Sequence, residues 1–310
     1  MKSANPVAEP IQLRSQRQRQ WHTFVRNKTA LLGLVVAVLI IIVAVFADDW
    51  FIALLQDRDA RPLFALFEPF KQDTFNRLQA PDSVHLMGLD DYGRDILSRI
   101  VHGGRVSLIV GICATLLGGI IGTTMGVVAG YMGGTVENVI MRVVDALMAF
   151  PGLLMGMMIL AVMQRLPGSG LTKAIIGIGI IMTSGFARVV HATALTVKGR
   201  EFVTSALSIG AGTSRIMRLH ILPNILGEVV VLVSLQTAQA IRIEASLSFI
   251  GLGVSPPTPT WGNMIKDGMQ HITYAPWLSV FSGLAIVLTV LSFNLLGDGL
   301  RDVLDPRLQE

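Results

Sequence analysis

Long apolar blocks separated by charged stretches are the dominant pattern of this sequence. The blocks are continuous rather than alternating, and each approaches the roughly 20 residues that a helix needs to cross about 30 Å of hydrocarbon. A helix satisfies its own backbone hydrogen bonds in that environment. We therefore predict an all-α, polytopic membrane protein with six transmembrane helices, at residues 29–47, 106–130, 139–163, 173–190, 225–249 and 277–296.

Lysine and arginine are distributed unequally between the loops, which predicts the orientation of the spans. The tail before the first span carries six basic residues against one acid, whereas residues 48–95 carry ten acids against five bases. The loop between the fourth and fifth spans is also basic. We expect both chain ends and this loop to be cytoplasmic, with residues 48–105 outside. Because the first block shows no cleavage site, it is expected to remain as a signal anchor. Residues 11–28, with their Arg, Lys, Trp21 and Phe24, are expected to lie along the inner membrane surface, and an ATPase-docking arm is the alternative.

Composition supports a membrane protein and excludes several other classes. Charged residues make up 15% of the chain, against roughly 25% in soluble domains, and the mean hydropathy is +0.60. A net charge of +4 is too small to suggest a nucleic-acid binder. The single cysteine, Cys113, excludes an internal disulfide and is expected to be a buried small hydrophobe. No phosphate-binding loop, zinc-protease motif or nucleophile elbow is present, and the histidines are scattered, so no catalytic residue and no metal site is predicted.

Two spans carry local signals for helix packing. Four glycines of the second span recur every fourth residue and share one helix face, which predicts the close approach of another helix; they are Gly118, Gly122, Gly126 and Gly130. In the third span Pro151 is expected to kink the helix. Arg142 and Asp145, three residues apart, are expected to form an ion pair on one face.

Charge inside the predicted spans is sparse. Glu228 and Glu244 fall toward opposite ends of the fifth span, and Arg242 is expected to offset the charge of Glu244. An ion-coupled carrier usually keeps carboxylates near the middle of the membrane. The pattern thus favours a transport pathway without its own energy source, with Gln236 and Gln239 as candidate pathway residues.

Glycine and proline mark the predicted ends of the last two spans. Gly251, Gly253 and the prolines at 256, 257 and 259 are expected to end the fifth span, after which Trp261 would lie at the outer membrane interface. Residues 297–299 (Gly-Asp-Gly) are expected to break the sixth span, and Arg301 and Arg307 to anchor its inner end.

The cytoplasmic segment 201–224 is the most informative part of the chain. It reads EFVTSALSIGAGTSRIMRLHILPN, which predicts a short helix ending at Gly210, a break at Gly212 and a second helix that exposes Arg215 and Arg218, with Pro223 closing the segment. From the residues alone, such a helix-turn-helix could lie on lipid headgroups or dock on a partner protein.

The same segment resembles the EAA motif of ABC importer permeases, E-A-A-x-x-x-G followed after nine residues by I-x-L-P. Thr204, Ser205 and Ala206 stand at the E-A-A positions, so the salt bridge expected of the family's glutamate has no counterpart at Thr204. Gly210 stands at the motif glycine, and His220, Leu222 and Pro223 occupy its closing positions. The predicted ATPase-coupling loop also includes Ala211, Gly212, Arg215 and Arg218. Three further blocks, at residues 87–111, 244–265 and 293–307, are similar to the peptide/nickel branch of that family. The chain therefore resembles the C-type permease of dipeptide, oligopeptide, nickel and glutathione importers.

This resemblance implies a type I ABC importer transmembrane domain in the bacterial inner membrane. It divides the chain into a cytoplasmic tail (1–28), a first helix with an extracytoplasmic segment (29–105), a core permease domain (106–298) containing the coupling loop (195–224), and a C-terminal tail (299–310). The implied partners are a homologous B-type permease, two ATPase subunits that bind ATP and magnesium, and a solute-binding protein, so this chain itself needs no cofactor.

The implied function is the import of di- or oligopeptides without enzymatic activity in this chain, with nickel chelates, glutathione and opine-like compounds as alternative substrates. An ion-coupled secondary transporter and a membrane-embedded hydrolase are the rival classes. The first would need coupling carboxylates and often an internal repeat. The second would need a nucleophile and base, or a metal site, inside the spans.

Overall fold

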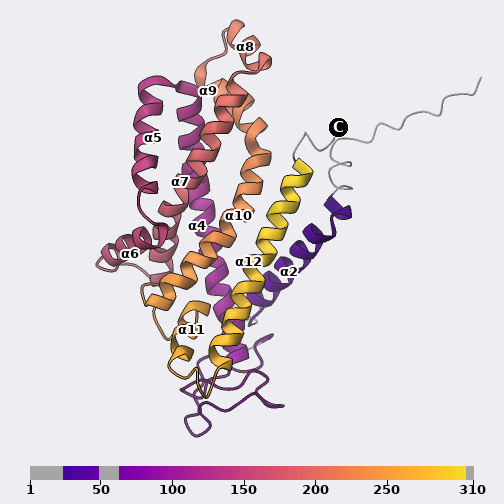
Figure 1. Cartoon of the computed structure of the whole chain (residues 1–310), viewed down its shortest axis with the longest axis vertical. Helices are drawn as coiled ribbons and strands as arrows, with labels where there is room; N and C mark the ends of the chain where they lie inside the picture. Colours follow the sequence, from indigo (N-terminus) through magenta and orange to yellow (C-terminus); the bar gives the residue numbers. More distant parts are fainter. Residues whose placement is uncertain (1–23, 49–62, 305–310) are drawn as a thin grey trace, which may run out of the picture.

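A computed structural model describes residues 24–48 and 63–304, and regular structure in these ranges is helical apart from isolated bridge positions, such as the pair Leu89 and Asp95. The long helices run along the long axis of the molecule, with the short helices α8 and α9 at one end and α11 at the other (Figure 1). In chain order the helices are α2 (Lys28–Val45), α4 (Ile96–Met132), α5 (Gly134–Met148), α6 (Gly152–Met163), α7 (Gly170–Lys198), α8 (Glu201–Ser208), α9 (Thr213–Ile216), the π-helical turn η1 (Met217–Ile221), α10 (Leu222–Ile250), α11 (Trp261–Met269) and α12 (Trp277–Leu304).

Five helical segments are long and apolar enough to cross a membrane, and a bent pair can supply a sixth crossing. This pair, α5 and α6, covers the predicted third span, but the two helices meet at an angle of 94°. Pro151 has no N–H and precedes α6 as its N-cap residue, with a ψ of 127° that is not helical. The break at this proline is therefore much sharper than the predicted kink.

The second and fifth predicted spans are longer in the structure. The helix α4 begins at Ile96, where the side chain of Asp95 accepts a hydrogen bond from the Ser98 N–H and caps the helix. The segment from Thr213 to Ile250 is a continuous helical run of 38 residues that includes η1. The prediction that Pro223 closes the preceding segment is wrong, because the helical run continues through Pro223, which follows directly on the π-helical turn η1 near the start of α10.

The sixth span also extends further than predicted. The helix α12 continues to Leu304 through the Gly-Asp-Gly sequence that was expected to break it. These glycines permit close helix approach instead: a Cβ atom on Gly297 would lie 2.6 Å from Leu235 Cδ2, and one on Gly299 would lie 2.0 Å from Ala30 Cβ. Arg301 lies in the last turn of α12 as expected, whereas Arg307 falls outside the described residues, as does residue Trp21 of the predicted surface helix.

The four periodic glycines of α4 pack against α7. A Cβ atom would lie 2.6 Å from the Gly179 carbonyl oxygen at Gly118, 2.4 Å from the Thr183 oxygen at Gly122 and 2.7 Å from the Ala187 oxygen at Gly126. Gly130 has similarly close contacts with Ala194. The predicted close approach is present, and α7 is the partner helix.

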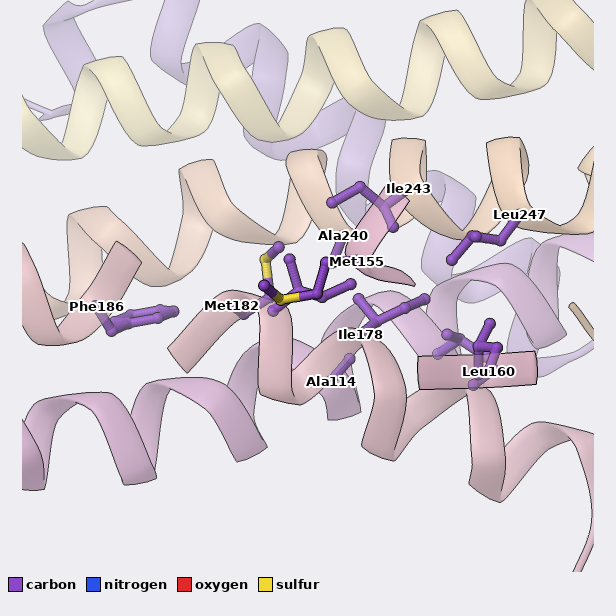
Figure 2. Close-up of a cluster of buried hydrophobic side chains, with 12 residues drawn as sticks. Ala114, Met155, Leu160, Ile178, Met182, Phe186, Ala240, Ile243 and Leu247 are labelled. Atoms are coloured by element: carbon purple, nitrogen blue, oxygen red, sulfur yellow. The ribbon is translucent and has the colours of Figure 1, made fainter. Parts of the chain in front are cut away.

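Large apolar side chains from α4, α6, α7 and α10 form the main core beside this contact. Phe186, Ile178, Leu160 and Leu247 are almost completely buried in it. Figure 2 shows these side chains directed into the space between the helices. By contrast, Cys113 on α4 is exposed in the isolated chain, so its predicted burial is wrong. Val110 and Ala114 of the same helix are completely buried in the core instead.

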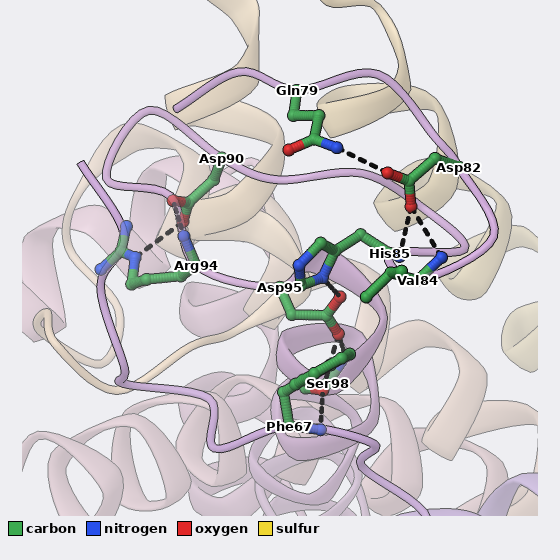
Figure 3. Close-up of polar contacts among 9 residues, drawn as sticks. All are labelled: Phe67, Gln79, Asp82, Val84, His85, Asp90, Arg94, Asp95 and Ser98. Atoms are coloured by element: carbon green, nitrogen blue, oxygen red, sulfur yellow. Dashed lines mark hydrogen bonds and ion pairs between the residues drawn. The ribbon is translucent and has the colours of Figure 1, made fainter. Parts of the chain in front are cut away.

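A cap of irregular chain, residues 63–95, covers the end of the bundle near α11, and buried ion pairs hold it together (Figure 3). The Asp90 carboxylate accepts hydrogen bonds from Arg94 Nε at 2.7 Å and from the Arg94 N–H, and lies 3.4 Å from Arg99 Nε. Asp95 contacts His85 Nδ1 at 2.9 Å while capping α4. The first part of the sequence block at 87–111 therefore belongs to this cap, and the rest forms the first turns of α4.

Trp261, the first residue of α11, is also part of this end of the molecule. It is buried, and its indole Nε1 donates a hydrogen bond to the Ile100 carbonyl oxygen at 3.0 Å. A Cβ atom on Gly104 would lie 2.9 Å from its ring. The expectation of an interfacial tryptophan is wrong, because α11 folds back against α4 and α12. The turn before it begins as expected, with α10 ending at Gly251 in the left-handed conformation (φ 95°).

Candidate coupling surface and membrane pathway

The short helix α8 and the turn after it form the tip of the end opposite the cap (Figure 1). Gly210 has a φ of 83°, and the Ala211 N–H bonds to the Ala206 carbonyl while the Gly210 N–H bonds to that of Leu207. This pair of bonds is the Schellman motif, in which a left-handed residue ends a helix and is usually glycine. Gly212 then precedes α9 as its N-cap residue. The predicted helix, turn and second helix are all present.

The two faces of α8 have different surroundings. Val203 and Ala206 are buried, and Val203 packs in a cluster with Ile216 and Ile221 of the following segment. The opposite face and the turn expose apolar side chains, which are Phe202, Leu207 and Ile209, the last with 86% of its surface accessible. An apolar surface of this kind at the end of a helical bundle is typical of a protein interface.

The predicted coupling residues divide between these faces. Only Ala206 is buried, and Ala211, His220 and Leu222 are partly buried. The remaining predicted residues are exposed at the tip or along the first turns of the following helix; they are Thr204, Ser205, Gly210, Gly212, Arg215, Arg218 and Pro223. The structure thus brings the predicted set together on one continuous segment, most of it accessible to a partner.

A hollow of about 330 Å³ lies beside α8, between the ends of α4 and α7. Its lining combines a cation with apolar and hydroxyl groups, from Tyr131, Met132, Lys198, Val203, Thr204, Leu207 and Thr213. The Lys198 ammonium lies 5.7 Å from the centre of the Tyr131 ring, within cation–π distance. Thr204, the residue at the position of the motif glutamate, therefore borders a cationic recess.

Within the membrane-spanning region, polar side chains from three helices meet. Arg188 of α7 pairs with Asp145 of α5, and both side chains are about half exposed, at 48% and 51%. The prediction that Asp145 pairs with Arg142 is therefore wrong, because Asp145 pairs with a residue of another helix. Thr193 of α7 donates a hydrogen bond to Glu228 of α10.

Residues of α10 extend this polar surface. Gln236 and Gln239 are partly buried, and a Cβ atom on Gly185 of α7 would lie 2.7 Å from the Gln236 amide nitrogen. Arg242 is exposed and has no ion-pair partner among the described residues. Its predicted pairing with Glu244 is wrong: residues two apart on a helix do not share a face. Glu244 is instead 1% exposed and accepts a hydrogen bond from Ser248 at 2.7 Å.

Comparison with known proteins decides the family. The family described as "Binding-protein-dependent transport system inner membrane component" matches residues 122–310. This is more than half of the chain, and it contains the tip, the polar surface and most of the core. The chain belongs to this permease family. A second family, described as "N-terminal TM domain of oligopeptide transport permease C", matches residues 15–81 of the permease.

Full-length relatives agree with this assignment. The permease is 40% identical over 307 residues to the glutathione transport system permease protein GsiD of Escherichia coli strain 536, an alignment covering 99% of this chain and 96% of the relative. The GsiD proteins of Shigella boydii strain Sb227 and Shigella flexneri strain 8401 are 40% and 41% identical over the same length. The predicted peptide/nickel branch is confirmed. The permease is a multi-pass inner-membrane subunit of a binding-protein-dependent ABC importer, and ATP hydrolysis belongs to partner subunits rather than to this chain.

Several residues of both surfaces were missed by the sequence analysis. Phe202, Leu207 and Ile209 of the permease carried a signal, since apolar residues next to a turn glycine and outside a span are unusual. Arg188 also carried one, as a charge inside an apolar block. Its pairing with Asp145 depends on the 94° bend between α5 and α6, which the sequence did not reveal.

Proposed function

We propose that the tip formed by α8 and its turn is the surface through which ATPase subunits drive this permease. The exposed apolar face of Phe202, Leu207 and Ile209 is the observation that carries the proposal. Buried against an ATPase groove, these side chains would supply binding energy at about 25 cal/mol per Å² of apolar surface. The cationic hollow beside Thr204 would receive an acidic side chain of the ATPase, in place of a salt bridge made by a glutamate at that position.

The complex that we infer contains this chain, a homologous B-type permease, two ATPases and an extracytoplasmic solute-binding protein. The chain ends and the α8 tip would face the cytoplasm, in agreement with the charge distribution, and the cap of residues 63–95 would face outward. ATP and magnesium would be bound by the ATPases, and this chain would hold no cofactor of its own. Closure of the ATPases would move the tip as a unit with the helix that begins at Thr213, because the run from there to Ile250 is continuous.

Small peptides are the substrate class that we propose, with glutathione as the first compound to test. The relatives at 40–41% identity are named as glutathione transport permeases, and glutathione is itself a tripeptide. The polar surface with Gln236, Gln239 and Arg242 offers amide and guanidinium groups that suit peptide bonds and carboxylates. Nickel chelates and opine-like compounds are the alternatives that the same assay can compare.

The decisive experiment is uptake by the complete complex in proteoliposomes. Labelled glutathione or dipeptide, presented on the binding protein, should accumulate with hydrolysable ATP and fail to accumulate with a non-hydrolysable analogue or with a proton gradient alone. Uptake driven by the gradient without ATP would contradict the proposal.

The orientation is tested separately with impermeant thiol reagents in intact cells. In a Cys113→Ala background, Asp73→Cys should be labelled from outside and Ser214→Cys only after permeabilisation. The reverse pattern would overturn the proposed orientation without affecting the family assignment.

A further inference from the structure

We propose that Arg242 forms a carboxylate-binding subsite on the translocation pathway of this permease. The inference rests on the proposed function, since it concerns the substrate class carried through the membrane. It goes beyond that function in assigning recognition of the substrate's free carboxylate to one side chain of the pathway.

The depth of Arg242 places a permanent charge inside the membrane. It lies eight residues before the end of α10 at Ile250, which is about 12 Å along the helix axis. The guanidinium is charged at every relevant pH. A charge at such a depth is costly when it faces lipid, so intramembrane arginines usually face a bundle interior or a water-filled cavity. Arg242 is exposed in the isolated chain and therefore does not face this chain's own core.

No carboxylate of the described residues neutralises Arg242. The carboxylate of nearby Glu244 points to the other side of α10, where it is buried and bonded to Ser248. Asp145 is paired with Arg188, and Glu228 accepts a hydrogen bond from Thr193. Each of the other charged groups along this part of α7 and α10 thus has a partner, whereas the guanidinium of Arg242 is left with five unoccupied donors.

Polar side chains flank Arg242 by one helix turn on each side. Gln239 and Ser246, three residues before and four residues after Arg242, share its helix face. Toward the other end of the same helix lie Gln236 and then Glu228, and the half-exposed Arg188–Asp145 pair continues the surface onto α7 and α5. An ion pair that is half exposed, ten residues inside α7, does not face lipid. The polar surface is therefore a wall of the pathway, and Arg242 is its unpaired cation.

A substrate carboxylate is the chemistry that fits this cation. Arginine binds a carboxylate through two parallel N–H···O bonds, and this geometry is both stronger and more specific than a contact with a neutral group. Every peptide with a free C-terminus presents one carboxylate, and glutathione presents two. A passing peptide would thus compensate the charge of Arg242 transiently, with the glutamine amides beside it to accept and donate hydrogen bonds.

The first test asks whether position 242 faces water. In the complete complex with Cys113→Ala, Arg242→Cys should react with small water-soluble methanethiosulfonate reagents. The matched control is Leu284→Cys on α12, which is 50% exposed and lies at a similar depth, seven residues after the start of its helix at Trp277. We expect labelling at 242 and little at 284. An unreactive Arg242→Cys, or equal labelling at both positions, would overturn the proposal.

The second test uses charge rescue and a matched pair of substrates. Peptides with a free or an amidated C-terminus are chosen so that the binding protein holds both with similar affinity. Wild type should transport the free acid faster, and Arg242→Gln should slow the acid by about tenfold, the loss of about 1.4 kcal/mol, with little effect on the amide. Modifying Arg242→Cys with a cationic aminoethyl reagent should restore uptake of the acid, whereas an anionic sulfonatoethyl reagent should not.

The other possible partners of Arg242 give different results. If Arg242→Gln slows uptake of the acid and the amide equally, Arg242 has a structural role. If the variant loses the partner permease on purification, Arg242 forms a salt bridge between subunits. If the effect of the variant depends on anionic phospholipid, Arg242 binds a lipid headgroup. Each of these outcomes overturns the subsite. Arg301→Gln, the same change at the end of α12, serves as the control for charge loss. If wild type itself shows no ATP-dependent uptake, the proposed function fails; if wild type transports and Arg242→Gln keeps its selectivity, only the subsite fails.

Discussion

The cap and the α8 tip, at opposite ends of the bundle, are built in opposite ways. In the cap, charged side chains are buried and paired within the chain, as Asp90 is with Arg94 and Arg99. At the tip, charged and apolar side chains are exposed, and the turn at Gly210 has no atom within 4 Å of the place where a Cβ would be. The cap also exposes apolar side chains, such as Phe75, but its fold depends on buried charges that are paired within the chain. No ion pair holds the described residues of the tip, which present their side chains outward. Changes at the cap should therefore affect stability, and changes at the tip should affect coupling.

The largest effect is expected from Asp90→Ala in the cap. Removing one partner of a buried ion pair typically costs about 3–5 kcal/mol, because the opposite charges remain buried without compensation. We expect a lower thermal midpoint of the purified complex and less permease in the membrane, with normal ATPase association in the fraction that folds. Glu68→Ala, which removes an exposed acid from the same segment, is the control. A normal midpoint for Asp90→Ala would contradict the structural role of the cap.

A smaller effect, confined to partner binding, is expected from Ile209→Ala at the tip. The change removes about three buried carbon atoms from the proposed interface, worth roughly 2 kcal/mol in total, or about thirtyfold in affinity. Titration of ATPase onto the reconstituted permease pair should show this loss, while the thermal midpoint should not change. Phe75→Ala, at a cap residue that is 98% exposed, should leave ATPase affinity unaltered. Equal losses for both variants would remove the distinction between the two ends.

Gly210→Val tests the shape of the turn rather than its contacts. A residue with a side chain pays roughly 1–2 kcal/mol for the left-handed conformation, and a β-branched one is strained further, so the turn should open. We expect uptake to fall about tenfold or more with membrane insertion intact. Gly210→Asn should retain more activity, since asparagine tolerates this conformation, and Gly212→Ala should be nearly neutral because its φ of −69° is ordinary. Unchanged uptake in Gly210→Val would show that the turn is not part of the coupling route.

The smallest effect is a pH dependence of the cap. Burial, together with the negative charge of Asp90, raises the pKa of Asp91 above its usual value. A carboxyl group with a raised pKa in the folded state binds its proton more tightly there than in the unfolded chain, so the stability increases as the pH falls through the raised pKa toward 3.8. The difference in thermal midpoint between wild type and Asp91→Asn should therefore change in favour of wild type on acidification. A constant difference between pH 7 and pH 4.5 would contradict this assignment.

The sequence predicted the parts of the fold that depend on local pattern. Apolar blocks located the spans, and the glycines at intervals of four in α4 predicted a close helix contact. Gly210 and Gly212 marked the turn and the second helix start at the tip. In each of these cases the physical cause lies within a few residues of chain, so that spacing alone carries the information.

Features that depend on tertiary context were mispredicted. Gly297 and Gly299 looked like a helix break, but a glycine within a helix also serves close packing, and the helices that lie against them are distant in sequence. Trp261 looked interfacial because the folding back of α11 could not be inferred. Arg242 and Glu244 looked like a pair in sequence, whereas helix geometry places them on different faces. The candidate site was thus predicted where it follows the loop motif and missed where it joins α5, α7 and α10.

The π-helical turn η1 affects how α10 is rotated about its own axis relative to the α8 tip. A π turn accommodates one more residue than an α turn, and each residue of an α-helix advances the side-chain direction by about 100°. The extra residue between Met217 and Ile221 therefore rotates all of α10 about its own axis relative to the tip. Without it, the face carrying Glu228, Gln239 and Arg242 would point about a quarter-turn away, toward a different neighbour. This single turn therefore determines the direction in which the proposed pathway face of α10 points, relative to the tip surface that an ATPase would hold.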